Sequence, residues 1–395
     1  MIHETLGSPG RLLRRAPTAV FVTLIAIRVA ALGHTIDNVT THPVTDVYVL
    51  RTEQIATSPG TPYRDFPVEY TFPENLAIQL IAGSGAETTA VRLALIAFLA
   101  DLAAAAAVWW GWGQRPAALY LMLGVPLLSF VYQRFDLVSV ALATWGLALV
   151  TRREDDVGGG LAIGSAVMLK LWPLAVAPLL VVRRRWRALT AAGAVCAMVG
   201  LAWLLVGGPK GPVQVLSFRG ARGWSVESIE GDLLWLASRG TPILEQGALR
   251  IGNAATWAKG LLLVGLVAYE VMVWRRAGGE ARDPAGGASL AAVTAVLVFS
   301  PLVSLQYATW LLPWTAVAFE GDRDERTVAK IAAVAIVFAG LLGLFYLAPW
   351  GWASAAQRWT ILARNVSFVL LLIVWYRAAV PSAPRPAQQH TVVSR

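Results

Sequence analysis

The chain has 395 residues, of which 56% are apolar and only 14% are charged. Soluble domains carry roughly 25% charged residues, so this composition excludes an ordinary soluble protein. The formal net charge is +9, but the basic residues form short patches between apolar blocks rather than a separate basic domain, which argues against nucleic acid as a partner.

The apolar residues form blocks of about 15–25, the length that a helix needs to cross roughly 30 Å of hydrocarbon. Backbone amides inside a bilayer must be paired within their own segment, so these blocks predict α-helices. The period-2 alternation of a membrane β-barrel is absent. Basic patches, such as Arg152 with Arg153 and the run 183–187, mark cytoplasmic loops. We therefore expect an all-α polytopic membrane protein whose two termini are cytoplasmic.

In chain order, residues 1–16 predict a basic cytoplasmic tail and residues 18–35 the first span. An uncleaved signal anchor fits this span better than a cleaved signal peptide, because many more spans follow. The long polar stretch 37–74 then forms the first outer loop. Residues 75–81 are apolar but too short to cross, so they predict a helix in the membrane interface.

Segments 88–110, 117–132 and 137–150 predict the next three spans. Residues 159–182 leave from one basic loop and end at another, which a single crossing cannot do. The break at Lys170-Leu171-Trp172-Pro173 therefore predicts two short helices that form a hairpin. Irregular backbone at this depth is tolerated only beside protein or a wet cavity, so the hairpin is expected to form a cavity wall.

The remaining apolar blocks bring the prediction to ten full spans plus the broken hairpin: 188–206, 253–274, 285–302, 308–319, 331–347 and 361–375. Residues 207–252 form a second large outer loop, and residues 1–380 a single membrane domain. The tail 381–395 is polar and proline-rich, which predicts disorder in the cytoplasm.

Charged residues are scarce within the predicted spans, where Asp101, Lys259 and Glu270 are the main cases. An ion-coupled transporter places ionisable residues along an intramembrane path. Long ordered loops between spans usually carry function, and the two long outer loops hold acids and bases. This distribution favours chemistry at the outer interface over transport.

Several short motifs lie at the predicted outer face. They are Asp46-Val47-Tyr48, the run from Gly60-Thr61-Pro62-Tyr63 to Glu69-Tyr70, Arg134-Phe135-Asp136, Lys170-Leu171-Trp172-Pro173, Arg222 to Glu227-Ser228, and Ser300-Pro301 through Gln306-Tyr307. With them the chain resembles the polyprenyl-phosphate-sugar-dependent glycosyltransferases of the GT-C superfamily. The closest resemblance is to the actinobacterial mannosyltransferases that elongate phosphatidylinositol mannosides. Two departures are Thr71-Phe72-Pro73 in place of a double proline and Gln306 where relatives often have histidine.

The resemblance implies a GT-C-like fold and an enzyme that moves a sugar, mannose first, from a polyprenyl-phosphate donor to a lipid or cell-envelope glycan. It places the active site at the outer face of the plasma membrane, with membrane lipids as further partners and no cofactor besides the donor. In an inverting transfer an aspartate can take the proton of the acceptor hydroxyl. The phosphate leaving group needs positive charge and hydrogen-bond donors rather than a general acid.

On this basis Asp46 is the expected general base; capping of a helix over 47–56 is an alternative use of the same residue. Asp37 is the alternative base. Arg222 is the first candidate for the donor phosphate and Lys170 the second, although Lys170 could instead extend to the membrane interface. Gln306 cannot carry a proton, so it does not inherit that role from a histidine.

Each of the other candidate site residues has a functional and a structural interpretation. Arg64 and Asp65 contact sugar or phosphate, or form a local ion pair of little energetic value. Glu69 orients the sugar or Tyr70, or bonds within its own loop.

In the later motifs, Glu227 organises Arg222 through a salt bridge or is merely exposed, and Tyr307 joins Gln306 at the outer turn. The acids are scattered and His42 stands alone, so no metal is expected.

Three other functions stay open. A lipid-linked sugar transporter or flippase would move its cargo without forming a glycosidic bond. A sister transferase would use arabinose, glucose or another sugar, since no residue string encodes contacts to individual sugar hydroxyls. A non-catalytic membrane scaffold is a further alternative, but it does not explain why the two outer loops are charged.

Overall fold

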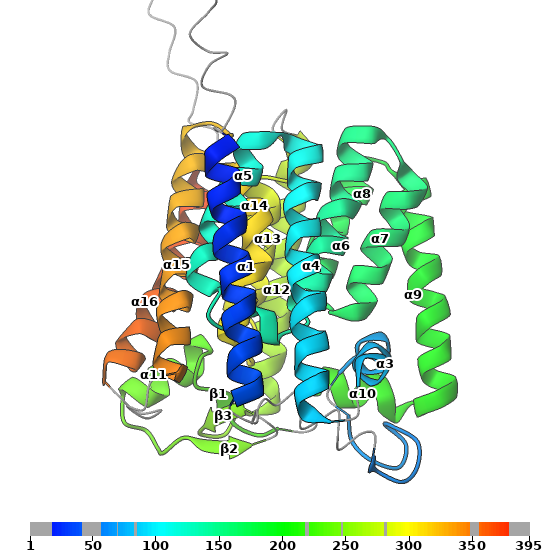
Figure 1. The fold of residues 1–395 in the computed structure, drawn as a ribbon, viewed down its shortest axis with the longest axis vertical. Helices are drawn as coiled ribbons and strands as arrows, with labels where there is room; N and C mark the ends of the chain where they lie inside the picture. Colours follow the sequence, from blue (N-terminus) through cyan, green and yellow to red (C-terminus); the bar gives the residue numbers. More distant parts are fainter. Residues whose placement is uncertain are drawn as a thin grey trace, which may run out of the picture.

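A computed structural model describes residues 18–41, 57–68, 70–82, 85–217, 221–245, 248–279, 283–347 and 355–378. Within these ranges the chain is mostly helical, and the long helices stand side by side as a bundle (Figure 1). Six helices of the described ranges are long and apolar enough to cross a membrane. They are α1 (Thr18–Thr41), α4 (Ala86–Trp112), α9 (Trp186–Gly207), α12 (Thr256–Gly279), α15 (Arg323–Leu347) and α16 (Ala355–Ala378). The protein is an integral membrane protein.

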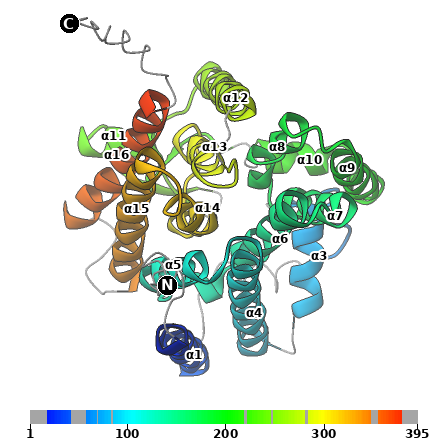
Figure 2. The same cartoon turned by 90° about the horizontal axis from the view of Figure 1, so that it is seen from above.

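Four predicted spans correspond to helices that are not among these six, so the prediction of ten full spans is not confirmed. These helices are α5 (Gln114–Gly124), α6 (Asp136–Ala148), α13 (Gly287–Val298) and α14 (Leu312–Ala318). The segment predicted as a broken hairpin contains α7 (Asp156–Leu169) and α8 (Pro178–Val182). Prolines account for several breaks, because proline lacks the N–H that a helix interior needs. Pro126 lies in the 3-10 turn that follows α5, and Pro313 lies in the first turn of α14. In Figure 2 α14 lies in the interior, whereas α1, α9 and α12 lie at the periphery.

The predicted hairpin is present. α7 ends at Leu169, a 3-10 turn covers Trp172–Ala175, and α8 follows. The two ends of the hairpin meet, because Arg185 lies 3.7 Å from Glu154 and 3.6 Å from Asp156. At the break, the Thr71 hydroxyl donates to the Leu169 carbonyl over 2.8 Å. The irregular backbone is thus covered by protein, as a membrane interior requires.

Small residues let the hairpin pack closely against α9. A Cβ atom on Gly164 would lie 2.7 Å from the Ala192 carbonyl oxygen, and Gly160 approaches the Ala188 backbone in the same way. Spacings of four between small residues on both helices bring backbones together in membranes. This packing sets where the C-terminal end of α7, and hence Lys170, lies.

One end of the bundle carries extra structure and is called the site end below (Figure 1). It holds α3 (Phe72–Ile81), which includes the predicted interfacial helix, and the folded part of the second large loop. That loop contains α10 (Lys210–Leu216), β1 (Trp224–Ser225), α11 (Ile229–Leu236), β2 (Ile243–Glu245) and β3 (Ala248–Ile251). The strands form an antiparallel sheet in the order β1-β3-β2, with Trp224 opposite Ile251 and Leu244 opposite Leu249. The all-α prediction did not include this sheet.

The opposite end carries the basic loops. Arg152 pairs with Asp283, which also accepts a hydrogen bond of 2.8 Å from the Trp112 indole. Arg153 lies over the ring of Trp110 at 4.4 Å. Tryptophan and arginine together are typical of a membrane–water interface. The two ends of the bundle therefore differ as the charge pattern predicts.

Candidate functional site

The ammonium group of Lys170 lies among buried acidic side chains at the site end. Its Nζ is 2.6 Å from Oε1 of Glu74, in the first turn of α3, and 3.9 Å from Oδ2 of Asp136, the first residue of α6. Both carboxylates are almost fully buried, whereas 16% of the Lys170 side chain is exposed. Charges at such depth require counter-ions. Lys170 is thus paired with carboxylates rather than extended to the lipid headgroups.

Three aromatic rings stack beside this cluster. Trp310 Nε1 donates to Asp136 Oδ1 over 2.9 Å, and its ring stacks on Tyr307 with centroids 4.1 Å apart. Trp172 stacks on Trp310 at 5.4 Å. The Tyr307 side chain lies within Coulombic reach of Lys170 and Asp136. Asp136 therefore connects the cation with the aromatic stack.

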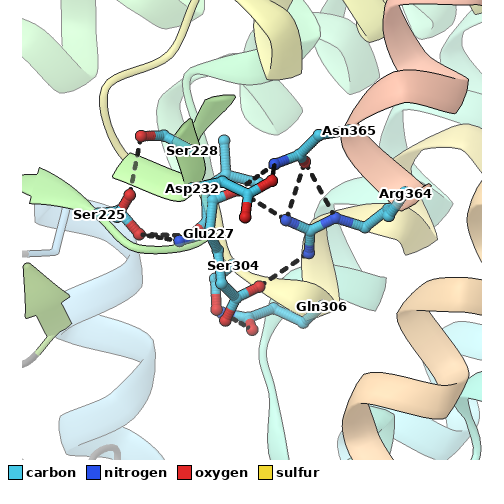
Figure 3. Close-up of polar contacts among 9 residues, drawn as sticks. Ser225, Glu227, Ser228, Asp232, Ser304, Gln306, Arg364 and Asn365 are labelled. Atoms are coloured by element: carbon cyan, nitrogen blue, oxygen red, sulfur yellow. Dashed lines mark hydrogen bonds and ion pairs between the residues drawn. The ribbon is translucent and has the colours of Figure 1, made fainter. Parts of the chain in front are cut away.

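A second polar network joins the large loop to the last helix (Figure 3). Arg364 of α16 donates from Nη1 to Glu227 Oε2 over 2.8 Å and from Nη2 to the Glu227 backbone oxygen over 2.6 Å. Asn365 Nδ2 reaches the same backbone oxygen at 3.4 Å and Asp232 Oδ2 at 3.3 Å. All four residues are buried. The last helix therefore fixes both the side chain and the backbone of Glu227.

Local sequence explains how the loop reaches α16. Ser228 caps α11 by accepting a hydrogen bond from Gly231 N over 3.2 Å, as serine commonly does at a helix start. Ser225 N donates to Pro301 O over 3.1 Å, and Ser225 Oγ donates to Val303 O over 3.0 Å. β1 is thereby attached to the turn between α13 and α14, just before the predicted residues Gln306 and Tyr307.

Burial raises the pKa values of two acids in α11. Burial raises the pKa of Asp232 to about 7, against the opposing effects of the Asn365 hydrogen bond and the Arg364 charge. Burial also raises the pKa of Glu230. Asp232 therefore titrates near neutral pH.

The structure brings part of the predicted site together. Tyr70 is buried with its ring 6.0 Å from Lys170 Nζ, and Tyr307 stacks beside the same cluster. Glu227 lies within Coulombic reach of Tyr307. Gln306 precedes Tyr307 and accepts a 2.5 Å hydrogen bond from Ser304, as Figure 3 shows. These five predicted residues surround the turn between α13 and α14.

Three predicted residues are exposed and lie outside this cluster. Arg64 donates to the Leu205 carbonyl over 3.3 Å, and Asp65 accepts from Thr61 N over 2.6 Å, so each has a local partner. The Arg222 side chain is exposed, and its backbone N donates to Glu245 over 2.9 Å.

Glu227 is buried and bound by Arg364, so the alternative that it is merely exposed is wrong. The backbone N–H groups of Arg222 and Gly223 hold the pKa of Glu245 below its usual range.

The expected base, Asp46, and the first-loop acid Glu69 lie outside the described residues, as do the proposed helix over 47–56 and the tail 381–395. The alternative base, Asp37, lies within α1, which continues to Thr41 rather than ending near residue 35. Part of the polar stretch 37–74 is thus helical at both of its ends.

Sequence reasoning missed Arg364, Asn365 and the roles of Glu74 and Asp136. Arg364 lies within an apolar block, and an ionisable residue there is a signal for function or pairing. Arg28 carries the same signal in the first span and was also missed. The contact partners could not be found from one sequence, since Arg364 and Glu227 are 137 positions apart.

The described residues contain no group of three or more histidines, cysteines or acids that could hold a metal ion. The cluster instead offers an ammonium group, carboxylates, an amide and aromatic faces. Such groups can bind a polar, hydroxyl-rich ligand and place charge beside a reacting centre.

Comparison with known proteins identifies the family. The family model described as glycosyltransferase family 87 matches residues 82–301, more than half of the chain. The chain belongs to glycosyltransferase family 87. This confirms the glycosyltransferase part of the resemblance noted from the sequence. The protein is therefore a membrane glycosyltransferase, and Lys170, Asp136 and Glu227 lie within the matched range.

One solved structure similar to this family 87 glycosyltransferase is the oligosaccharyltransferase of Archaeoglobus fulgidus in the apo form, with 13% sequence identity and a TM-score of 0.39. The match covers 91% of this chain and 56% of the oligosaccharyltransferase, so the chain spans little more than half of that protein's length. No curated protein matches the chain.

Proposed function

We propose that this glycosyltransferase moves mannose from a polyprenyl-phosphate donor to a lipid or cell-envelope glycan at the outer face of the plasma membrane. The observation that carries the proposal is the convergence of Lys170, Tyr70 and Tyr307 with buried carboxylates at the site end. Three segments meet there, all within a bundle of membrane helices. A lipid-linked substrate can reach such a place without leaving the bilayer.

The reaction is an inverting displacement at the anomeric carbon. The acceptor oxygen forms the new bond to that carbon as the bond to the phosphate oxygen breaks, and Asp46 takes the hydroxyl proton. The lipid phosphate leaves as a stable anion and needs only cationic stabilisation. The exposed guanidinium of Arg222 is suited to the phosphate, because arginine can bind two of its oxygens at once.

The remaining residues are assigned to the sugar and its surroundings. Lys170, Tyr70, Tyr307 and Gln306 contact the transferred sugar or its phosphate, with Glu227 held beside them by Arg364. The exposed residues Arg64 and Asp65 contact the sugar or its phosphate, and Glu69 orients the sugar or Tyr70. No metal and no cofactor take part.

Purified protein in lipid nanodiscs and radiolabelled polyprenyl-phosphate mannose provide the test. We expect a new labelled glycolipid, and we expect Asp46→Asn to lower kcat by about 100-fold or more, as loss of a general base does. Asp37→Asn is the matched control, and we expect near-normal activity. Loss with Asp37→Asn and full activity with Asp46→Asn would reverse the assignment of the base.

A donor panel separates the alternatives. Transfer from polyprenyl-phosphate arabinose or glucose, and not mannose, identifies a sister transferase. Movement of the labelled lipid between leaflets without a new glycosidic bond identifies a flippase and overturns the proposal.

A further inference from the structure

Two buried carboxylates, those of Glu74 and Asp136, lie near the ammonium group of Lys170 in the described part of the chain. Glu74, at 2.6 Å, already gives Lys170 a close counter-ion. Asp136 adds a second carboxylate to a nearly dry site, and it is fully buried. A buried carboxylate without full compensation is costly. Its presence suggests a use beyond neutralising Lys170.

The two oxygens of Asp136 are in different situations. Oδ1 accepts the indole N–H of Trp310 over 2.9 Å, which fixes the orientation of the carboxylate. Oδ2 is buried and accepts no hydrogen bond from any group in the described ranges. It is directed toward Lys170 Nζ at 3.9 Å, which is too long for a hydrogen bond.

A separation of this size accommodates one bridging hydroxyl oxygen. Two hydrogen bonds of about 2.8 Å that meet at roughly a right angle span such a distance. A hydroxyl group can accept a proton from an ammonium group and donate its own to a carboxylate. The Lys170 side chain keeps 16% of its surface exposed, whereas the Asp136 side chain is fully buried. Tyr307, stacked on Trp310, offers an aromatic face nearby.

We propose that Asp136 Oδ2 and Lys170 Nζ together bind one hydroxyl group of the transferred sugar. This inference rests on the proposed function, because it assigns a contact within the same donor site. Asp136 then has two roles. One oxygen accepts a hydrogen bond from the sugar hydroxyl. The other accepts the Trp310 N–H and so positions Trp310 and the Tyr307 ring stacked on it. Glu74 acts as a positioning residue that keeps the ammonium group in place.

The proposal predicts coupling between Asp136 and a single sugar hydroxyl. Asp136→Asn keeps an oxygen that can accept from Trp310 but loses the charged acceptor for the hydroxyl. We expect kcat/KM for the parent donor to fall by about tenfold, in the range for losing a charged hydrogen bond. Among donors that carry 2-, 3-, 4- or 6-deoxymannose, one should be used about tenfold less well by the wild type. With that donor Asp136→Asn should cause no further loss.

Trp310→Phe is the matched control. It keeps an aromatic ring and removes only the N–H that binds Oδ1. Because Asp136 keeps its charge, the enzyme should still use the same deoxy donor less well than the parent donor, even where the looser carboxylate lowers kcat/KM for both. Thermal unfolding of each variant in nanodiscs shows that the comparison is made on folded protein. If Asp136→Asn lowers kcat/KM equally for the parent and for every deoxy donor, the proposal is wrong. A water molecule that bridges Asp136 and Lys170 would give this result.

Equilibrium binding of the same labelled donors separates this inference from the proposed function. If the wild type transfers the sugar but Asp136 shows no coupling with any hydroxyl, the proposed function is supported and the proposed hydroxyl contact is wrong. If binding shows coupling between Asp136 and one hydroxyl but no sugar is transferred, the hydroxyl contact is supported and the proposed reaction is wrong.

Discussion

Among the described residues, two of the clusters of buried charge differ in composition. In the first, Arg28 of α1 binds Asp101 of α4 through Nε over 2.8 Å. Asp101 also accepts hydrogen bonds from Tyr120 at 2.8 Å and Tyr132 at 3.0 Å, so both of its oxygens are used. One cation faces one carboxylate, and none of the four side chains is appreciably exposed. We call this the Arg28 cluster.

The described residues of the Lys170 cluster include one cation and two carboxylates, and one oxygen of Asp136 accepts no hydrogen bond from any of the described groups. It lies where α7 breaks and is partly exposed, whereas Arg28 and Asp101 join the middles of long helices. A charge-balanced cluster suits the joining of helices, although Arg28 Nη2 finds no partner among the described groups. An unbalanced cluster at a helix break suits the binding of a ligand.

The largest expected effect is on stability, at the Arg28 cluster. Arg28→Met leaves Asp101 buried without its cation, and breaking a buried pair in this way typically costs about 3–5 kcal/mol. We expect a much lower thermal midpoint in nanodiscs with unchanged kcat per folded molecule. Arg28→Met combined with Asp101→Leu should recover part of the lost stability. A normal midpoint with loss of kcat would instead make this cluster functional.

The next effect is on catalysis, at the other cluster. Lys170→Met removes the ammonium group from the proposed donor site, and losing one preorganised charge or donor typically lowers kcat/KM by about 100- to 1,000-fold. Transfer from labelled donor measures the change. Lys210→Met, an exposed lysine in α10 at the same end, is the control and should be near normal. Equal losses in both variants would indicate a general effect of surface charge.

Local pattern predicted much of the framework that carries these clusters. Apolar blocks between basic patches identified the long helices, and the proline after Lys170 identified the hairpin. Both signals lie within a few residues of the feature they specify. The lengths of α13 and α14 were overestimated, because an apolar block of 12–18 residues has the same composition whether it forms one continuous helix or an interrupted one. The sheet has strands of two to four residues, too short for an alternation to be recognised.

The partners within the site depend on tertiary contacts, which one sequence does not encode in a readable form. Lys170 was predicted as a candidate, but its carboxylates come from α3 and α6, and Glu74 was seen only as the end of a loop. Glu227 was assigned to Arg222, five positions away, whereas Arg364 binds it from the last helix. Arg364 was missed, because a pairing across 137 positions leaves no local pattern.

A smaller effect is expected where α16 holds the large loop. Arg364→Lys keeps the charge but cannot reach the carboxylate and the backbone oxygen of Glu227 with a planar fork. We expect kcat/KM to fall by about tenfold, mainly through a higher KM for the donor, because the loop is held less firmly. Arg358→Lys is the control on the same helix, where the cation can still lie over Trp235. A change confined to stability would leave Arg364 outside the site.

The smallest effect is a pH dependence in the same network. Burial raises the pKa of Asp232 to about 7, above its value in the unfolded chain. Between these two values the folded state binds the extra proton, so stability is greatest at low pH and falls as the pH rises through 7. Asp232→Asn is neutral at every pH. Its thermal midpoint should therefore match the wild type near pH 3, below both values, and exceed it by a few degrees near pH 8. The opposite order, with the wild type more stable at pH 8, would mean that the ionised form of Asp232 is stabilised in the folded protein, with Arg364 as the cation nearest to it.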